Sequence, residues 1–200
     1  LHTSWRVGGP ARYFFIPETL EDLSVFMRSL DKNIPILMLG LGSNILVRDG
    51  GFPGAVISLH QGLSNLIRVG DFRIRAEAGV ACARFSRFAS LNSLSGAEFL
   101  SGIPGTIGGA LAMNAGAFGE ETWKLVKTVQ LINRNGIIED CESSEFSPSY
   151  RKVGIPTNQW FVSGEFELHE DFLKKGREKI RSMLIDRGNN QPIRQPSAGS

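Results

Sequence analysis

The pattern of apolar and polar positions predicts a chain of short strands and helices. Residues 72–78 alternate between apolar and charged side chains, which is typical of a strand buried on one face. Residues 35–39 are wholly apolar, so we expect that strand to be buried. Further strand patterns occupy residues 11–16, 45–47, 55–59, 125–133, 137–141 and 160–168.

Helical spacing of apolar side chains appears in several other segments. Thr19 and Asp22 resemble the two ends of a capping box, which predicts a helix directly after Thr19. Residues 81–93 and 170–187 have the same kind of periodicity. Pro104 suits the first position of another helix, because a missing amide hydrogen costs nothing there.

The order of these elements favours an α+β fold. Asn135-Gly136 separates two strand patterns and predicts a tight hairpin turn. The elements do not alternate regularly between strand and helix, which disfavours a doubly wound parallel sheet. We expect boundaries near residues 60 and 170, giving segments 1–60, 61–169 and 170–200.

Composition excludes several classes of protein. The chain is 42% hydrophobic and 21% charged with a net charge of +2, which argues against a disordered chain and a general nucleic-acid binder. It has no run of about 20 apolar residues, so no membrane span is predicted. Cys82 and Cys141 lack metal-site spacing, and we expect reduced structural thiols in a cytosolic protein without a metal. The chain also has no leader pattern and ends abruptly, and we interpret it as a fragment.

Glycine is unusually frequent and unevenly placed. The chain has 23 glycines in 200 residues, against a usual share of about 7%. They concentrate in residues 8–10, 40–44, 101–109 and 114–119. Because glycine costs conformational entropy on folding, each cluster needs a reason.

The segment 40–44 follows a predicted strand and has two interpretations. A dinucleotide fingerprint would need glycine at the position of Ile45, and no Gly-Lys-Ser/Thr of a Walker A loop is present. The segment is then either a plain tight turn or an anion-binding nest of backbone amides. Ser43 and Asn44 would add side-chain donors to a nest.

The second cluster also has two interpretations. Gly105, Gly108, Gly109 and Ala112 share one helical face, which suits close approach of a flat ligand or tight packing on a strand. Unpaired amides at the start of this helix would favour an anion. Two glycine loops in one small chain favour a diphosphate ligand held from two sides.

A set of motifs in order gives the sequence a family resemblance. These motifs are, in chain order, Thr3-Ser4-Trp5-Arg6-Val7-Gly8-Gly9-Pro10-Ala11, Gly40-Leu41-Gly42-Ser43-Asn44, Ile103-Pro104-Gly105-Thr106-Ile107-Gly108-Gly109, Asn114-Ala115-Gly116-Ala117, Tyr150-Arg151, Gln191-Pro192 and Ala198-Gly199-Ser200. With this set the chain resembles the UDP-N-acetylenolpyruvoylglucosamine reductase (MurB) family, in its second type that lacks a substrate-side insertion.

The resemblance implies an FAD-binding fold of the vanillyl-alcohol-oxidase (PCMH) type. Residues 1–60 and 61–169 would be two α+β subdomains that hold FAD, and 170–200 the start of a third, substrate-binding domain that is mostly missing. We therefore expect the chain as given to be inactive. No histidine lies in either glycine loop, which favours non-covalent FAD. The implied cofactor-binding residues are Gly40, Gly42, Ser43, Asn44, Gly105, Thr106, Gly108, Gly109, Asn114 and Gly116.

The resemblance also implies a reaction in the cytoplasm. NADPH would reduce FAD, which would pass a hydride to the enolpyruvyl ether of UDP-N-acetylglucosamine, a small-molecule substrate, with no obligate protein partner. Arg151 would hold the developing negative charge and Ser200 would donate the proton. Tyr150, Arg151, Arg187 and Arg194 would bind the substrate. The alternatives are another FAD-dependent oxidase or dehydrogenase of this fold and a non-catalytic nucleotide-binding module.

Overall fold

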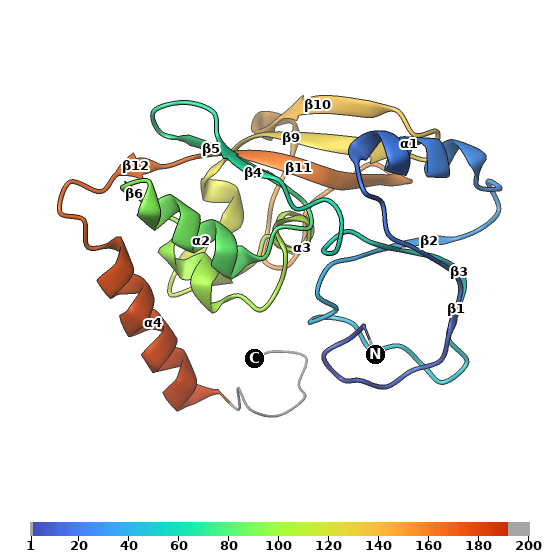
Figure 1. Cartoon of the computed structure of the whole chain (residues 1–200), viewed down its shortest axis with the longest axis horizontal. Coiled ribbons are helices and arrows are strands. Elements are labelled where there is room, and N and C mark those ends of the chain that lie inside the picture. The colour runs from blue at the N-terminus through green and yellow to red at the C-terminus, as the bar shows by residue number, and fades with distance from the viewer. Residues whose placement is uncertain (1, 192–200) are drawn as a thin grey trace.

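The structure is a computed structural model that describes residues 2–191 and contains two main sheets flanked by helices (Figure 1). The described part is an α+β chain, as the element order predicts. In Figure 1 the larger sheet runs across the top, α2 and α3 lie beneath it, and the smaller sheet lies to the right.

The smaller sheet has three parallel strands in the order β1-β3-β2. The strands are β1 (Ala11–Phe15), β2 (Ile36–Leu39) and β3 (Phe52–Ser58). Helix α1 (Leu20–Ser29) joins β1 to β2, and the Thr19 hydroxyl accepts the Asp22 amide at 3.1 Å, as predicted for its cap. Three of the four β2 residues are only half-buried, so the expected buried strand is wrong in part, because β2 is an edge strand.

The larger sheet has five antiparallel strands in the order β10-β9-β11-β5-β4. These are β4 (Leu66–Arg68), β5 (Arg73–Glu77), β9 (Val126–Asn133), β10 (Ile138–Glu142) and β11 (Gln159–Glu167). The strand predictions for 72–78, 125–133, 137–141 and 160–168 are confirmed, as is the hairpin at Gly136. Strand β4 is absent from the sequence prediction, because its three residues are too few to show a periodicity.

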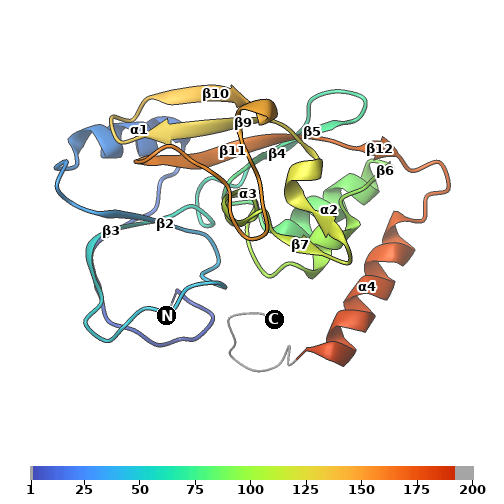
Figure 2. The ribbon, with the colours of Figure 1, turned by 180° about the vertical axis from the view of Figure 1, so that it is seen from behind.

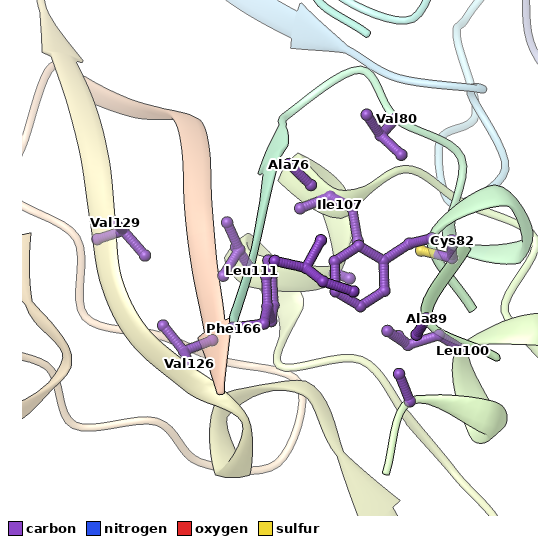
Figure 3. Close-up of a cluster of buried hydrophobic side chains, with 14 of the residues drawn as sticks. Ala76, Val80, Cys82, Ala89, Leu100, Ile107, Leu111, Val126, Val129 and Phe166 are labelled. Atoms are coloured by element: carbon purple, nitrogen blue, oxygen red, sulfur yellow. The ribbon is translucent and has the colours of Figure 1, made fainter. Parts of the chain in front are cut away.

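The main core lies between this sheet and the elements beneath it (Figure 3). Helix α2 (Cys82–Leu91), predicted over 81–93, contributes Phe85. The Phe85 ring packs edge-on against that of Phe166 in β11, with 4.8 Å between the ring centroids. The short helices η1 (Glu98–Gly102) and α3 (Ile107–Met113) supply Leu100 and Leu111, both fully buried.

A second core joins the two sheets. Leu23 and Met27 of α1 are fully buried with Ile132 of β9 and Val162 of β11. Helix α1 joins two strands of the smaller sheet and packs in a core that both sheets share. The subdomain boundary near residue 60 stays a prediction.

The remaining short elements lie in the connections between the main strands and helices. They are β6 (Leu94–Ser95), β7 (Gly116–Ala117), β8 (Glu120–Glu121), η2 (Thr122–Lys124), η3 (Ser143–Glu145) and β12 (His169–Glu170). Figure 2 shows α4 (Gly176–Asn190) standing apart from the larger sheet. None of the helices in residues 2–191 is long and apolar enough to cross a membrane.

The strand predicted at 45–47 is wrong. Leu46 is 65% exposed, and the segment forms a loop beside Gly8 and Gly9. The Gly9 amide donates to the Arg48 carbonyl at 2.9 Å, and a Cβ on Gly8 would lie 2.6 Å from Val47 Cβ. Val47 therefore lies against the N-terminal segment rather than in a sheet.

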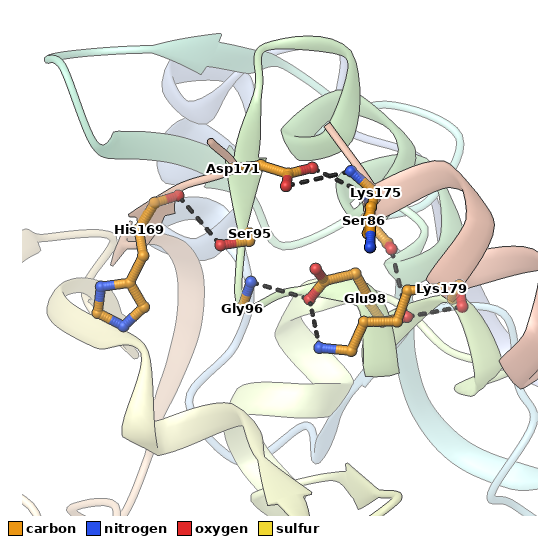
Figure 4. Close-up of polar contacts among 10 residues, drawn as sticks. Ser86, Ser95, Gly96, Glu98, His169, Asp171, Lys175 and Lys179 are labelled. Atoms are coloured by element: carbon orange, nitrogen blue, oxygen red, sulfur yellow. Dashed lines mark hydrogen bonds and ion pairs between the residues drawn. The ribbon is translucent and has the colours of Figure 1, made fainter. Parts of the chain in front are cut away.

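The helix predicted over 170–187 begins later, at Gly176, and runs to Asn190. Asp171 explains the late start, because its carboxylate accepts a hydrogen bond of 2.8 Å from the Gly176 amide. The helix is attached to the core through Glu98, which is 4% exposed, and Lys179, whose Nζ lies 3.5 Å from the Glu98 Oε2 (Figure 4).

Candidate functional site

The two glycine segments that the sequence singled out lie against each other. Gly40 follows β2, and a Cβ placed on it would come within 2.4 Å of the Thr106 Oγ1. A Cβ placed on Gly105 would lie 3.7 Å from the Ser43 Oγ. The structure therefore brings segment 40–44 and the start of α3 to one place, as expected for a ligand held from two sides.

Segment 41–44 presents backbone amides without acceptors. Among the hydrogen bonds between described residues, none has its donor in the amides of residues 41–44. Gly42 adopts the left-handed region at φ +65°, and its carbonyl accepts the Ser4 amide at 3.0 Å, which fixes the loop. Consecutive free amides in such a turn form an anion-binding concavity.

The start of α3 differs from the expectation. The helix begins at Ile107 with Thr106 as its N-cap, and not at Pro104. Thr106 has extended backbone and a side chain that accepts the Gly109 amide at 3.5 Å, which makes it the better terminus.

The amides expected to be free at this helix start are already bonded. The Ile107 amide donates to the Val80 carbonyl and the Gly108 amide to the Ala78 carbonyl, both at 2.8 Å. The expectation of an anion held by unpaired amides of α3 is therefore wrong. The segment from Ala78 to Val80 follows β5 and supplies acceptors that the sequence pattern does not reveal.

The glycines of α3 have two different uses. A Cβ on Gly108 would lie 2.7 Å from the Ala78 Cβ, so this glycine allows tight packing. A Cβ on Gly109 would meet nothing closer than the Thr106 Oγ1 at 3.8 Å, and Gly105 has similar room. Packing explains Gly108, whereas Gly105 has room beside Ser43 and Gly109 leaves open surface on the helix.

Thr3 was not predicted as a site residue. Its Oγ1 is buried without a hydrogen-bond partner among the described residues, and its Cα lies 2.8 Å from the position of a Cβ on Gly42. An orphaned hydroxyl beside free amides fits a polar ligand group at this loop. The open face at Gly105 and Gly109 fits the flat part of such a ligand, so these residues fit a bound FAD.

Asn114 and Gly116 are used by the protein itself. A Cβ on Gly116 would lie 2.5 Å from the Glu120 carbonyl across the β7–β8 hairpin. Asn114 is 4% exposed, and its side chain bonds Glu121 and Trp123. The geometry gives no support to direct cofactor contacts by these two residues.

Tyr150 and Arg151 form the tip of an exposed turn. The Ser149 amide donates to the Lys152 carbonyl at 2.8 Å, which closes the turn. Tyr150 is 83% exposed, and the Arg151 guanidinium lies 5.9 Å from the centre of its ring. Arg151 has φ +52°, a left-handed backbone that non-glycine residues seldom adopt without a reason.

Arg187 lies beside η1. Its Cδ is 3.8 Å from the position of a Cβ on Gly102, and its Nε donates to the Gln191 Oε1 at 2.9 Å. Burial lowers the pKa of the Arg187 guanidinium. Arg194 and Ser200 lie outside the described residues.

The two cysteines are free thiols, as expected. Burial raises the pKa of the Cys82 thiol to about 12. The pKa of Cys141 is also raised, by partial burial first and then by nearby carboxylates.

Comparison with known proteins gives consistent matches. The family described as "FAD binding domain" matches residues 11–142. The UDP-N-acetylenolpyruvoylglucosamine reductase of Methylococcus capsulatus is 50% identical over all of this chain and 66% of its own length. That of Nitrosomonas eutropha is 47% identical over all of this chain and 63% of its own length. The chain thus spans about two thirds of the length of these relatives.

A solved structure is also similar. The crystal structure of UDP-N-acetylenolpyruvylglucosamine reductase (MurB) from Thermus caldophilus has a TM-score of 0.84 and 30% identity, over 99% of this chain and 70% of that one. These matches confirm the predicted FAD-binding α+β fold of the vanillyl-alcohol-oxidase type.

Proposed function

Because the chain belongs to the UDP-N-acetylenolpyruvoylglucosamine reductase family, we propose that it holds FAD in an NADPH-dependent reductase of peptidoglycan precursor synthesis. The substrate is the enolpyruvyl ether of UDP-N-acetylglucosamine, and the product is UDP-N-acetylmuramate. Bound FAD supplies the hydride transfer from NADPH to the enolpyruvyl group. The enzyme acts on this small nucleotide sugar, and its cytoplasmic location stays a prediction.

One observation carries the proposal. The amides of residues 41–44 have no acceptor among the described residues, and they lie beside the open face at Gly105. A diphosphate supplies acceptor oxygens for several amides at once, which a plain tight turn does not require. The same loop carries Ser43 and Asn44, whose side chains add two further donors.

The proposed cofactor-binding residues act in two ways, either by contacting FAD or by letting the surrounding segments pack closely. Ser43, Asn44 and the amides around Gly42 bind the diphosphate, while Gly105 and Gly109 leave room for the flat ring system. Gly40, Thr106 and Gly108 act indirectly, because they let the two glycine segments and the strand end approach closely.

Arg151 and Ser200 have complementary roles in the proposed reaction. Hydride addition to the enolpyruvyl group builds negative charge that spreads into the substrate carboxylate, and a permanent cation such as Arg151 stabilises it. Ser200 then donates a proton to the adjacent carbon. Tyr150, Arg187 and Arg194 bind the nucleotide sugar.

The proposal is tested on the full-length protein by steady-state kinetics. The protein should be yellow, and its oxidation of NADPH should accelerate when the enolpyruvyl substrate is added. A colourless protein that binds no added FAD would leave only a nucleotide-binding module. A yellow protein whose NADPH oxidation ignores the substrate would instead support a different FAD-dependent reaction.

A further inference from the structure

Asn114 ends α3 in an unusual and heavily bonded position. It is 4% exposed and has φ +41°, the left-handed conformation of a helix C-cap. Its Oδ1 accepts the Trp123 amide at 3.1 Å. Its Nδ2 donates to the Glu121 Oε2 at 3.0 Å and to the Ser149 carbonyl at 3.4 Å. The side-chain amide therefore has all its bonds within the protein.

The bond to Ser149 reaches a segment far away in the sequence. Figure 2 shows the long connection from β10 to β11 passing beside α3. Two apolar contacts hold this connection: the Phe146 ring lies 4.9 Å from that of Trp123, and Val153 is buried in the main core. Between these anchors, Ser149 closes the turn that carries Tyr150 and Arg151.

Helix α3 therefore links the two halves of the site. Its N-terminal end meets segment 40–44, and its C-terminal Asn114 bonds the turn of Tyr150 and Arg151. The seven residues of α3 span about 10 Å. A fixed turn at one end would hold the Arg151 guanidinium at a set distance from a ligand at the other.

We propose that Asn114 is a positioning residue for Arg151, acting through its hydrogen bond to the Ser149 carbonyl rather than through the cofactor. This inference rests on the proposed function, because it assumes that Arg151 acts on the substrate. Glu121 and Trp123 orient the Asn114 amide so that one N–H points at the turn.

Three variants of the full-length protein separate this role from a structural one. Asn114→Gly keeps the left-handed backbone and removes all side-chain bonds. The Asn114→Asp, Glu121→Gln double variant keeps the net charge, the acceptor for the Trp123 amide and a bond between positions 114 and 121. It replaces the donor to Ser149 by a carboxylate oxygen, which cannot donate to the Ser149 carbonyl. Asn158→Gly is a matched control, because Asn158 is also left-handed at φ +61° and exposed on the same connection.

The readout is reoxidation of the reduced flavin by the enolpyruvyl substrate, followed by stopped-flow absorbance in proteins of equal FAD content and melting temperature. Asn114→Gly and the charge-conserving double variant should both slow this step by about 10- to 100-fold. Asn158→Gly should match the wild type. Full activity in the charge-conserving variant would overturn the inference, because the Ser149 bond would then have no effect.

A double-mutant cycle with Arg151→Ala tests whether the loss passes through Arg151. If it does, adding Asn114→Gly to Arg151→Ala should slow reoxidation no further. Multiplicative losses would overturn the inference and leave the proposed function intact. Unimpaired reoxidation in Arg151→Ala would overturn both the assigned role of Arg151 and the inference built on it. A wild type that is not reoxidised by the substrate would contradict the proposed function itself.

Discussion

Adding a methyl group at two neighbouring glycines of α3 should have opposite effects on stability and FAD binding. The two changes are Gly108→Ala and Gly109→Ala. In a helix, alanine is favoured over glycine by about 1 kcal/mol. At Gly109 the new methyl meets only the Thr106 Oγ1 at 3.8 Å, so the apoprotein should gain up to about that amount.

At Gly108 the new methyl would lie 2.7 Å from the Ala78 Cβ and 3.1 Å from the Ala78 carbonyl oxygen. Overpacking of this kind costs about 1–3 kcal/mol, which offsets the gain in helix propensity. Gly108→Ala should therefore be destabilised by roughly 0–2 kcal/mol. Thermal unfolding of the apoproteins measures both changes.

The FAD affinity should follow the opposite order. If the cofactor lies on the open face, the methyl group of Gly109→Ala clashes with it. The clash costs about 1–3 kcal/mol of binding free energy, which raises the Kd for FAD roughly 5- to 150-fold. Quenching of flavin fluorescence on titration measures the Kd. Gly154→Ala is the control, because no atom lies within 4 Å of its Cβ position and it is outside both glycine segments. A wild-type Kd for Gly109→Ala would refute the assignment of this face to the cofactor.

Three further predictions concern a thiol, a buried carboxylate and the proposed acid. The folded pKa of Cys82 is raised from 9.0 to about 12, so alkylation of the native protein at pH 9 should modify Cys141 and spare Cys82, as peptide mass spectrometry would show. Because that pKa is raised, the thiol's contribution to stability is intact below pH 9 and falls by at most about 1.4 kcal/mol per pH unit above it, which urea unfolding at several pH values checks. Glu98→Ala should lower the free energy of unfolding by about 2–3 kcal/mol, because it removes a buried carboxylate with charge-assisted bonds. Glu167→Ala removes one partner of a half-exposed ion pair and should lower it by under about 1 kcal/mol. Equal urea midpoints for the two variants would contradict this difference. Ser200→Ala should leave flavin reduction by NADPH intact and block reduction of the substrate, and survival of both half-reactions would show that Ser200 is not the acid.

Local sequence patterns predicted the helices and strands whose signal lies within a few neighbouring residues. Alternation over 72–78 and the Thr19 cap each depend on a few neighbouring residues, and both are found. The strand at 45–47 fails because three apolar residues do not distinguish a strand from a loop that packs on another segment. The late start of α4 depends on the Asp171 carboxylate, whose capping bond spans five residues.

The candidate site shows the same division. Glycine spacing and the family resemblance predicted that segments 40–44 and 105–109 belong together, and the structure places them in contact. Which amides are free was not predictable, because the acceptors for Ile107 and Gly108 come from residues 78–80. The bonds of Asn114 to Trp123 and Ser149 likewise join segments that no local pattern connects.

We propose that these residues hold FAD for a reaction with an enolpyruvyl nucleotide sugar. The most direct measurement is anaerobic absorbance of the full-length protein in two steps, first with NADPH and then with the substrate. NADPH should bleach the visible flavin bands, and the enolpyruvyl ether of UDP-N-acetylglucosamine should restore them, with UDP-N-acetylmuramate formed in equal amount. Bands that stay bleached after the substrate is added would contradict it.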